Sequence, residues 1–458
     1  MNRPSDLDFL REAEFPYLDA AGHAYLDYTG AALAPLSLVR ASAARLGSGV
    51  YGNPHTASPA SQASTRLVEE AREAVLAFCG ASPREYAVVF TPNATAAIRL
   101  VAEAYPFGPG RPLAFLGDDH NSVLGMRRYA ARAGAPVRVV PLGPGFRTEP
   151  SAVTACLGAG GQGLFAFPAQ SNATGVRHPL EWVGEARRAG WRVLLDAAAY
   201  VPTGPLDLTA VPADFVALSW YKITGFPTGV GCLVARRDAL AELRRPWFAG
   251  GTVRASSSHT DWHLPAPPPE GFEDGTLPFL ALPDVTAAAA WHREIGYDAV
   301  HHHVTGLTAR LLTGLTALRH PDGTPAVRVL GPLSDRDRGP TVTFNLLHPD
   351  GTPVDERHLQ HSAATARVSL RTGCFCNPGV AEEANGMTPE IVHAALLRGT
   401  PADVDTYLHH LAVQAQGAVR ASVGVATNTR DVDRLLEVCA ELVDGGLEGE
   451  MPEPRTGC

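Results

Sequence analysis

Lys222 is the only lysine in a chain whose 38 basic residues are otherwise all arginine. It lies in the segment SWYKITGFPTGVG, residues 219–231. A guanidinium stays protonated at any working pH, whereas an amine can lose its proton and form a Schiff base with a carbonyl compound. Biased codon usage that leaves one lysine by chance is the simpler explanation, so the residues around Lys222 must decide between the two.

The neighbours of Lys222 favour the chemical explanation. The apolar run 213–220 has the length of a buried strand, and a second apolar run follows at 229–235. Between them, GFPTG is rich in turn-forming residues. Lys222 is therefore expected where a buried strand ends. Burial disfavours the charged form of an amine, so we expect a lowered pKa there.

Three further positions beyond predicted strands carry complementary chemistry. The turn TPNATAA, residues 91–97, opens a helix, and free N–H groups at a helix N-terminus can bind a phosphate. Asp196 follows RVLL and can either cap a loop or face the protonated nitrogen of a pyridine ring. His120, in LGDDHNSV, can stack on a flat ring or move a proton. With Lys222, these positions predict pyridoxal 5′-phosphate as the cofactor.

The elements that position these residues alternate between strands and helices. Short apolar runs separated by amphipathic helices predict an α/β fold with a largely parallel sheet, whose ligands bind at the carboxyl ends of the strands. The predicted strands are 87–91, 112–117, 137–142, 163–168, 192–198 and 215–220, and the predicted helices are 64–80, 93–105, 122–134 and 180–190.

A proline-rich stretch, 258–275, interrupts this alternation and predicts a domain boundary soon after it. We expect an N-terminal segment (1–34), a large cofactor-binding domain (35–280), a smaller α+β C-terminal domain (281–445) and a disordered acidic tail (446–458). The predicted elements of the smaller domain are helices 284–296 and 299–318 and strands 326–331, 341–347, 367–372 and 418–424.

Composition narrows the class of function. The net charge is −9 and no basic run occurs, which argues against a nucleic-acid or acidic-membrane partner. No apolar stretch is long enough to span a bilayer, and the start of the chain is too charged for a signal peptide, so we expect a cytoplasmic protein. The seven cysteines are scattered, which makes a disulfide framework unexpected. The histidines at 301–303 lack companion ligands, so we expect surface histidines and no metal site.

In chain order, the segments NAT, DDH, LLDAAA, SWYKITGFPTGVG, FEDGTL, RTGCFCNPG and AVRASVG resemble the class V aminotransferase fold, a fold type I architecture of pyridoxal-phosphate-dependent transferases. The chain is most similar to the amino-terminal cysteine-desulfurase part of molybdenum cofactor sulfurases, from about residue 25 to residue 436. This resemblance implies an enzyme that removes sulfur from L-cysteine, giving alanine and a protein persulfide for transfer to an acceptor such as the molybdenum cofactor.

The resemblance also implies residue roles. Lys222 carries the cofactor, Asp196 pairs with its ring nitrogen and His120 stacks on its ring. Cys376 holds the position of the reactive cysteine, with Cys374 two residues earlier and also able to reach the site. The remaining implied residues are Ala94, Thr95 and Ser219 at the phosphate, Asn172 near the ring hydroxyl and the substrate, Arg420 at the substrate carboxylate, and Thr276 at the phosphate of the partner subunit. A homodimer with shared active sites follows.

Two residues depart from the pattern of related desulfurases. Ala199 stands where a glutamine is common, and Tyr221 stands where a histidine is common. The sequence also ends where a full-length sulfurase continues into a carboxy-terminal domain, which leaves the sulfur acceptor open. A C–S lyase, an aminotransferase or an epimerase on the same fold are alternatives. A non-catalytic dimeric binding protein is a further alternative, against which the presence of Lys222, Asp196 and Arg420 argues.

Overall fold

The apolar runs of the first half of the chain form one seven-stranded sheet in the computed structural model, which describes residues 7–158, 162–399, 401–411 and 417–445. In spatial order its strands are β2 (Tyr86–Thr91), β8 (Gly231–Arg236), β7 (Phe215–Ser219), β6 (Arg192–Asp196), β5 (Leu164–Pro168), β3 (Leu113–Leu116) and β4 (Val137–Val140). Only β8 runs against the others, between β7 and β2. The predicted α/β class and largely parallel sheet are therefore confirmed.

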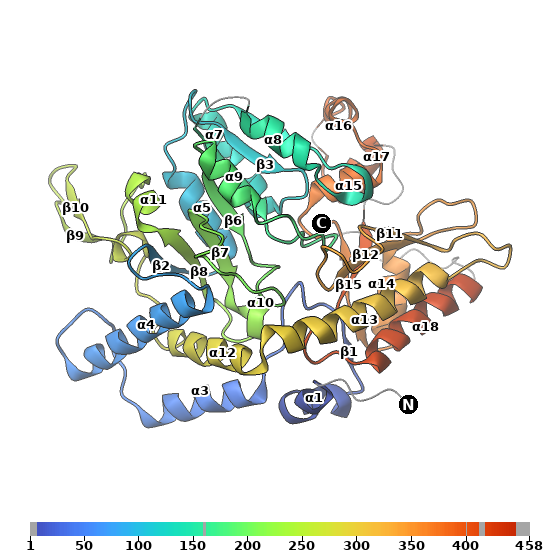
Figure 1. Cartoon of the computed structure of the whole chain (residues 1–458), viewed down its shortest axis with the longest axis horizontal. Helices are drawn as coiled ribbons and strands as arrows, with labels where there is room; N and C mark the ends of the chain where they lie inside the picture. Colours follow the sequence, from blue (N-terminus) through green and yellow to red (C-terminus); the bar gives the residue numbers. More distant parts are fainter. Residues whose placement is uncertain (1–6, 159–161, 400, 412–416, 446–458) are drawn as a thin grey trace.

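Helices cover both faces of this sheet, which explains why its strands are continuous apolar runs (Figure 1). Along β2, Val88 and Phe90 point into one core while Ala87 and Val89 point into the other. The helices on the first face are α4 (Pro59–Phe78), α8 (Pro150–Gly158), α9 (Trp182–Arg188) and α12 (Leu282–Ile295), and those on the second are α5 (Ala94–Ala104), α6 (Asn121–Leu124), α7 (Arg127–Arg132) and α11 (Arg237–Glu242). The predicted helix 122–134 is thus two helices, separated around Gly125, a poor helix former.

The apolar layers on the two faces of the large sheet together form the first core of the molecule. A second core is built on a four-stranded antiparallel sheet in the order β11 (Val327–Leu330), β12 (Thr341–Leu346), β15 (Ala418–Ser422) and β14 (Arg371–Gly373). The helices α13 (Tyr297–Ala317), α14 (Glu356–Thr365) and α18 (Thr429–Gly445) pack on it, with α13 and α18 side by side in Figure 1. The predicted strand 367–372 is two short strands, because β13 (Val368–Ser369) pairs with β1 (Ala24–Tyr25) whereas β14 pairs with β15.

The N-terminal residues belong to this second core. Ala24 and Leu26 are fully buried among residues of α13, β12 and β15. The preceding helices α1 (Asp8–Glu14) and α2 (Pro16–Ala20) are held to the C-terminal part by Arg11, which donates to Asp431 at 2.6 Å. The start of the described chain therefore packs with this second core.

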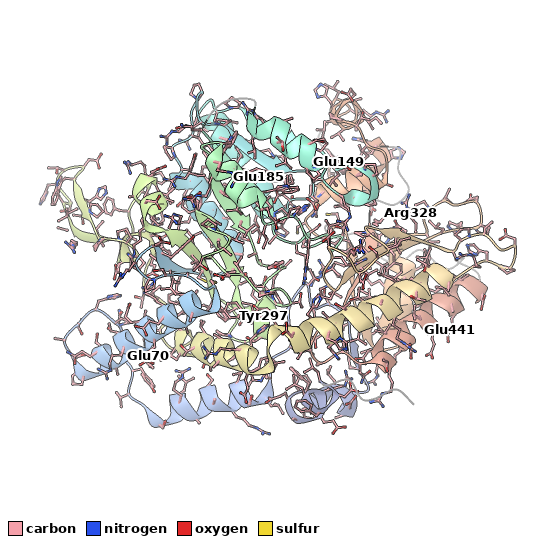
Figure 2. All side chains as sticks on the ribbon, viewed as in Figure 1. Glu70, Glu149, Glu185, Tyr297, Arg328 and Glu441 are labelled. Atoms are coloured by element: carbon pink, nitrogen blue, oxygen red, sulfur yellow. The ribbon has the colours of Figure 1, made fainter. Side chains whose placement is uncertain are left out.

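The connection between the two cores runs through α12 and α13. Leu282, Val285 and Ala288 of α12 pack into the core of the large sheet, whereas α13 packs into the second core. Tyr297, labelled in Figure 2 at the start of α13, donates its hydroxyl to the Val201 carbonyl at 2.9 Å. The domain limits stated above stay predictions, and the tail 446–458 lies outside the described residues.

Three other segments refine the sequence predictions. Part of the proline-rich stretch forms a hairpin with the residues before it, made of β9 (Val253–Ser256) and β10 (His263–Pro265), at the left of Figure 1. Of the three consecutive histidines, His301 and His302 are exposed, but His303 is buried against the Thr427 carbonyl, so the surface prediction is wrong for His303. Within the described ranges, no helix is both long and apolar enough to cross a bilayer.

Candidate active site

The turn between β2 and α5 meets the end of β7. The Ala94 N–H donates to the Ser219 hydroxyl at 2.9 Å, and Ser219 is 1% exposed. Asn93 caps α5 by accepting from the Ala96 N–H at 3.0 Å. A side chain at Gly231 would place its Cβ 2.5 Å from the Asn93 Cα, so only glycine fits beneath this turn. The structure therefore brings Ala94 and Ser219 together around a helix N-terminus suited to a phosphate.

Lys222 and Asp196 follow adjacent parallel strands. Asp196 ends β6 opposite Ala217 of β7, and Lys222 lies three residues beyond the end of β7, in the short helix α10 (Trp220–Thr224). Burial lowers the pKa of the Lys222 amine, an effect that the Asp196 carboxylate opposes. The Arg420 charge adds to the lowering. The expected strand-end position and the lowered pKa of the lysine are both present.

His120 caps α6, and its hydrogen bonds fix its tautomer. Its Nδ1 accepts from the Ser122 N–H at 3.1 Å, so that nitrogen is unprotonated in the neutral ring and Nε2 carries the proton. Burial lowers the pKa of His120, with Asp196 opposing and Lys222 adding to that shift. His120 is therefore a neutral imidazole whose electrostatic neighbours are the lysine and the aspartate.

Ser122, which sequence reasoning did not single out, links His120 to Thr95. The Ser122 hydroxyl is 2.8 Å from His120 Nδ1 and 2.8 Å from the Thr95 hydroxyl. Because Nδ1 can only accept in this tautomer, the Ser122 hydroxyl donates to the ring and accepts from Thr95. The histidine is thus joined by hydroxyl groups to the first turn of α5.

Two arginines face each other across β14 and β15 and share one carboxylate. Arg371 is directly opposite Arg420, and Asp27 bridges them, at 2.9 Å from Arg371 Nη2 and 2.8 Å from Arg420 Nη2. Arg420 also donates to the Asn172 carbonyl at 3.0 Å, while its buried Nε has no partner among the described residues. One positive charge remains uncompensated in this group. Asp27, from the N-terminal segment, was missed because nothing in its local sequence indicates a partner about 390 residues away.

The side chain of Asn172 is hydrogen-bonded to the loop that carries Cys374 and Cys376, which we call the cysteine loop. Its Nδ2 donates to the Phe375 carbonyl at 2.8 Å, and its Oδ1 accepts from Asn377 at 3.0 Å. Its expected position near a cofactor hydroxyl stays a prediction. What the structure places here is a direct link between the loop after β5 and the cysteine loop.

The two cysteines of that loop differ in state. Cys376 is a free, partly exposed thiol, whereas Cys374 is buried and disulfide-bonded. Phe375 and Cys376 both have left-handed backbone angles, φ 57° and 53°. Each such non-glycine residue costs about 1 kcal/mol or more, so the surrounding contacts must hold the turn. Arg371 and Arg420 are charged side chains that both interact electrostatically with the Cys376 sulfur.

Thr276 lies apart from these residues. It is exposed and lines a cavity of about 420 Å³ together with Thr91, Pro92 and Trp247. The loop before it is anchored by Glu273, whose buried carboxylate binds both Nη atoms of Arg72 at 2.7 Å and accepts from the Phe90 N–H at 2.7 Å. Among the described residues of this single chain, no hydrogen bond joins Thr276 to Lys222.

The two departures noted in the sequence have structural counterparts. The amide of Gln170, a buried residue, donates to the Ala199 carbonyl at 2.9 Å. Gln170 and Lys222 line the same small pocket, together with Tyr28 and Thr203. Burial raises the pKa of Tyr221, and a hydrogen bond with Ser219 opposes this rise.

The residues present fit a phosphate-bearing aldehyde. A capped helix N-terminus with a buried serine suits the phosphate, a carboxylate at a strand end suits a pyridinium nitrogen, and an amine of lowered pKa suits an imine. Fold and site together define a pyridoxal-phosphate class of α/β protein. The chain belongs to the class-V aminotransferase family, whose model matches residues 24–435.

Individual relatives give a more specific comparison than the family does. The chain is 37% identical to the molybdenum cofactor sulfurase of Bos taurus over 457 residues, covering 93% of this chain and 51% of the relative. It is 35% identical to that of Homo sapiens, covering 99% and 53% respectively. The chain thus spans about half the length of these relatives. Among solved structures, the apo cysteine desulfurase of Thermococcus onnurineus NA1 matches with a TM-score of 0.79 and 25% identity, over 97% of this chain and 99% of that one.

Proposed function

We propose that this protein is a pyridoxal-phosphate-dependent cysteine desulfurase that stores the sulfur of L-cysteine as a persulfide on Cys376. One observation carries the proposal: a single lysine of lowered pKa beside Asp196, with a free cysteine on a loop docked against the same strand ends. The similarity to cysteine desulfurases and to molybdenum cofactor sulfurases supports it.

Ala94, Thr95 and Ser219 bind the phosphate in this proposal. When bound, the cofactor supplies an aldehyde for the amine and a sink for electrons released on the substrate. Asp196 would balance the charge of the ring nitrogen, and neutral His120 would contact the ring. Lys222, whose lowered pKa makes its amine available as a base, takes the proton from the substrate α-carbon. Arg420, with the uncompensated charge of the arginine pair, binds the substrate carboxylate.

Sulfur transfer then needs only the thiolate of Cys376. The thiolate attacks the substrate sulfur, an S–S bond forms as the Cβ–S bond breaks, and the electron pair of that bond stays with carbon. Protonation of this carbon, together with return of the proton from Lys222 to the α-carbon, completes alanine. A thiol and cysteine therefore give a persulfide and alanine, and no external oxidant or reductant is consumed. We also place the protein in the cytoplasm, as the sequence predicts.

The proposal extends to the partners of the reaction. Thr276, exposed beside the turn that leads into α5, acts on the phosphate site of a second copy, so the active form is a homodimer with shared sites. The persulfide sulfur passes to an acceptor, for which the molybdenum cofactor is the candidate that the relatives' names support.

Incubation of the purified, cofactor-loaded protein with L-cysteine tests the proposal. We expect alanine in solution and, without added thiol, about one persulfide per subunit on Cys376. Cys376→Ala should retain the cofactor, store no persulfide and release little alanine. Pyruvate and sulfide without alanine would instead identify a C–S lyase, and full alanine formation by Cys376→Ala would refute the persulfide.

A further inference from the structure

The loop that presents Cys376 is held from several sides. Its two left-handed residues, Phe375 and Cys376, are unfavourable in isolation. The Cys376 carbonyl accepts from the Asn121 N–H at 2.7 Å, which also satisfies a free N–H at the start of α6. Gly379 lies so close to β3 that a Cβ there would be 1.8 Å from the Gly117 carbonyl oxygen. The cysteine loop is thus packed directly onto the turn that carries His120.

Asn377 makes the central contacts of this docking. It is completely buried. Its Nδ2 donates to the Asp118 carbonyl at 2.6 Å and to Asn172 Oδ1 at 3.0 Å, and its Oδ1 accepts from the Val380 N–H at 3.4 Å. Both amide protons therefore meet acceptors, one on the turn after β3 and one on the loop after β5. No other side chain in the described cysteine loop joins both.

The same side chain has two separable tasks. Through Oδ1, Asn377 caps the N-terminus of α15 (Pro378–Ala384). Through Nδ2, it ties the residue next to Cys376 to the strand ends that hold His120 and Asn172. An aspartate has the same shape and is a good helix cap, but it has no proton to donate in its ionised form. The two tasks can therefore be tested separately.

We propose that Asn377 is the positioning residue that holds Cys376 at the active site, so that sulfur is taken from the substrate by a cysteine on a docked loop. Asn377 touches no reacting atom and acts through the backbone of Cys376. The inference rests on the proposed role of Cys376 in sulfur transfer. Its geometric part, the docking of the loop through the two Nδ2 contacts, is testable without catalysis.

The decisive variant is Asn377→Asp, which keeps the cap and removes both donors. We expect kcat for alanine formation to fall about 10- to 100-fold, because small misplacement of a reacting group is costly. The KM for L-cysteine and the pyridoxal phosphate content should stay within about twofold of wild type. A purely structural role would lower the melting temperature without this separation of kcat from KM.

Alkylation of the free thiols gives a readout independent of activity. In Asn377→Asp, iodoacetamide should modify Cys376 faster relative to Cys156, a partly exposed free thiol in α8 that serves as the internal reference. Asn377→Ser, which also caps a helix and lacks the amide, should behave alike if the aspartate variant does not fold. The matched control is Asn385→Asp at the other end of α15, where Nδ2 donates to the Ala381 carbonyl at 2.8 Å. This control should leave kcat and the alkylation ratio unchanged.

The outcomes separate the two proposals. A wild-type protein that makes no alanine refutes the desulfurase, and the alkylation ratio alone then decides the docking. An alkylation ratio equal to wild type in both Asn377 variants overturns the inference. In an active protein, an unchanged kcat in both variants overturns it as well, whatever the alkylation rate.

Discussion

At the scale of single residues, the environment of His120 is set by a serine. The Ser122 N–H and hydroxyl both point at Nδ1, and a hydrogen bond donated to an unprotonated ring nitrogen stabilises the neutral form. Burial works in the same direction on the pKa of His120. The state of the ring therefore depends on a hydroxyl that also contacts Thr95, a residue of the proposed phosphate site.

Ser122→Ala should raise the pKa of His120. The variant removes a donor that favours the neutral ring, so the ring becomes protonated at a higher pH than in wild type. The acid limb of the kcat/KM profile should move up by about half a pH unit, the worth of one hydrogen bond. Ser122→Thr keeps the hydroxyl and should restore the profile. A limb that stays in place or moves to lower pH would show that Ser122 does not control His120.

Lys222→Arg should be as inactive as Lys222→Ala, with alanine formation reduced about a thousandfold or more. A guanidinium preserves the positive charge and the length of the side chain but supplies no amine that can lose a proton. Alanine release and the pyridoxal phosphate bound covalently after borohydride reduction measure the two effects. Wild-type turnover by the arginine variant would show that the cofactor does not react at Lys222.

At the scale of elements, one buried ion pair, between Arg72 and Glu273, anchors the loop that leads to Thr276. Arg72 of α4 reaches both Glu273 and Glu69, which are 3% and 57% exposed in their side chains. The same arginine also donates to the Val88 carbonyl in β2 at 2.6 Å. One guanidinium thus joins α4, β2 and the loop that leads to Thr276.

Glu273→Gln should lower the free energy of unfolding by about 3 kcal/mol, because it removes the buried counter-charge of the guanidinium and leaves only the exposed Glu69. Glu69→Gln is the matched control on the same arginine. Its loss should be below about 1 kcal/mol, since exposed pairs contribute little. Denaturant unfolding of both variants provides the comparison. Equal losses would mean that burial does not govern the strength of this pair.

The elements show what the sequence could and could not predict. The strands of the large sheet were predicted because both of their faces are buried, which produces apolar runs such as LFAFP at Leu164–Pro168. The strand ends then indicated Lys222, Asp196 and His120. Asp27, Asn377 and Gln170 were not predicted as site residues. Their roles depend on contacts across the fold, as between Asn377 and Asp118, 259 residues apart, and such contacts leave no local pattern.

At the scale of the whole molecule, the position of Thr276 argues for two chains per active unit. In one chain it lies on an exposed loop beside a cavity of about 420 Å³ that Trp247, itself 50% exposed, also lines. The neighbouring hairpin presents Trp262 and Leu264, which are 53% and 47% exposed. Exposed apolar side chains beside this cavity and on the hairpin fit an interface between copies.

Mixing two inactive variants tests the shared site. In a heterodimer of Lys222→Ala and Thr276→Ala chains, one site combines an intact Lys222 with an intact Thr276 from the other chain. Co-expression with random pairing should therefore restore roughly a quarter of wild-type activity, since half of the dimers are mixed and each has one intact site. Sedimentation should show a dimer. An active monomer, or no recovery in verified heterodimers, would contradict the shared site.

The single side-chain amine of Lys222 allows the molecule to be labelled at one defined position. Because every other basic side chain among the 38 is an arginine, an amine-selective reagent has one side-chain target in the whole chain. Mass added to the peptide 219–231 then counts accessible active sites directly. Protection of that peptide by bound ligand becomes a binding assay, which needs neither mutation nor turnover.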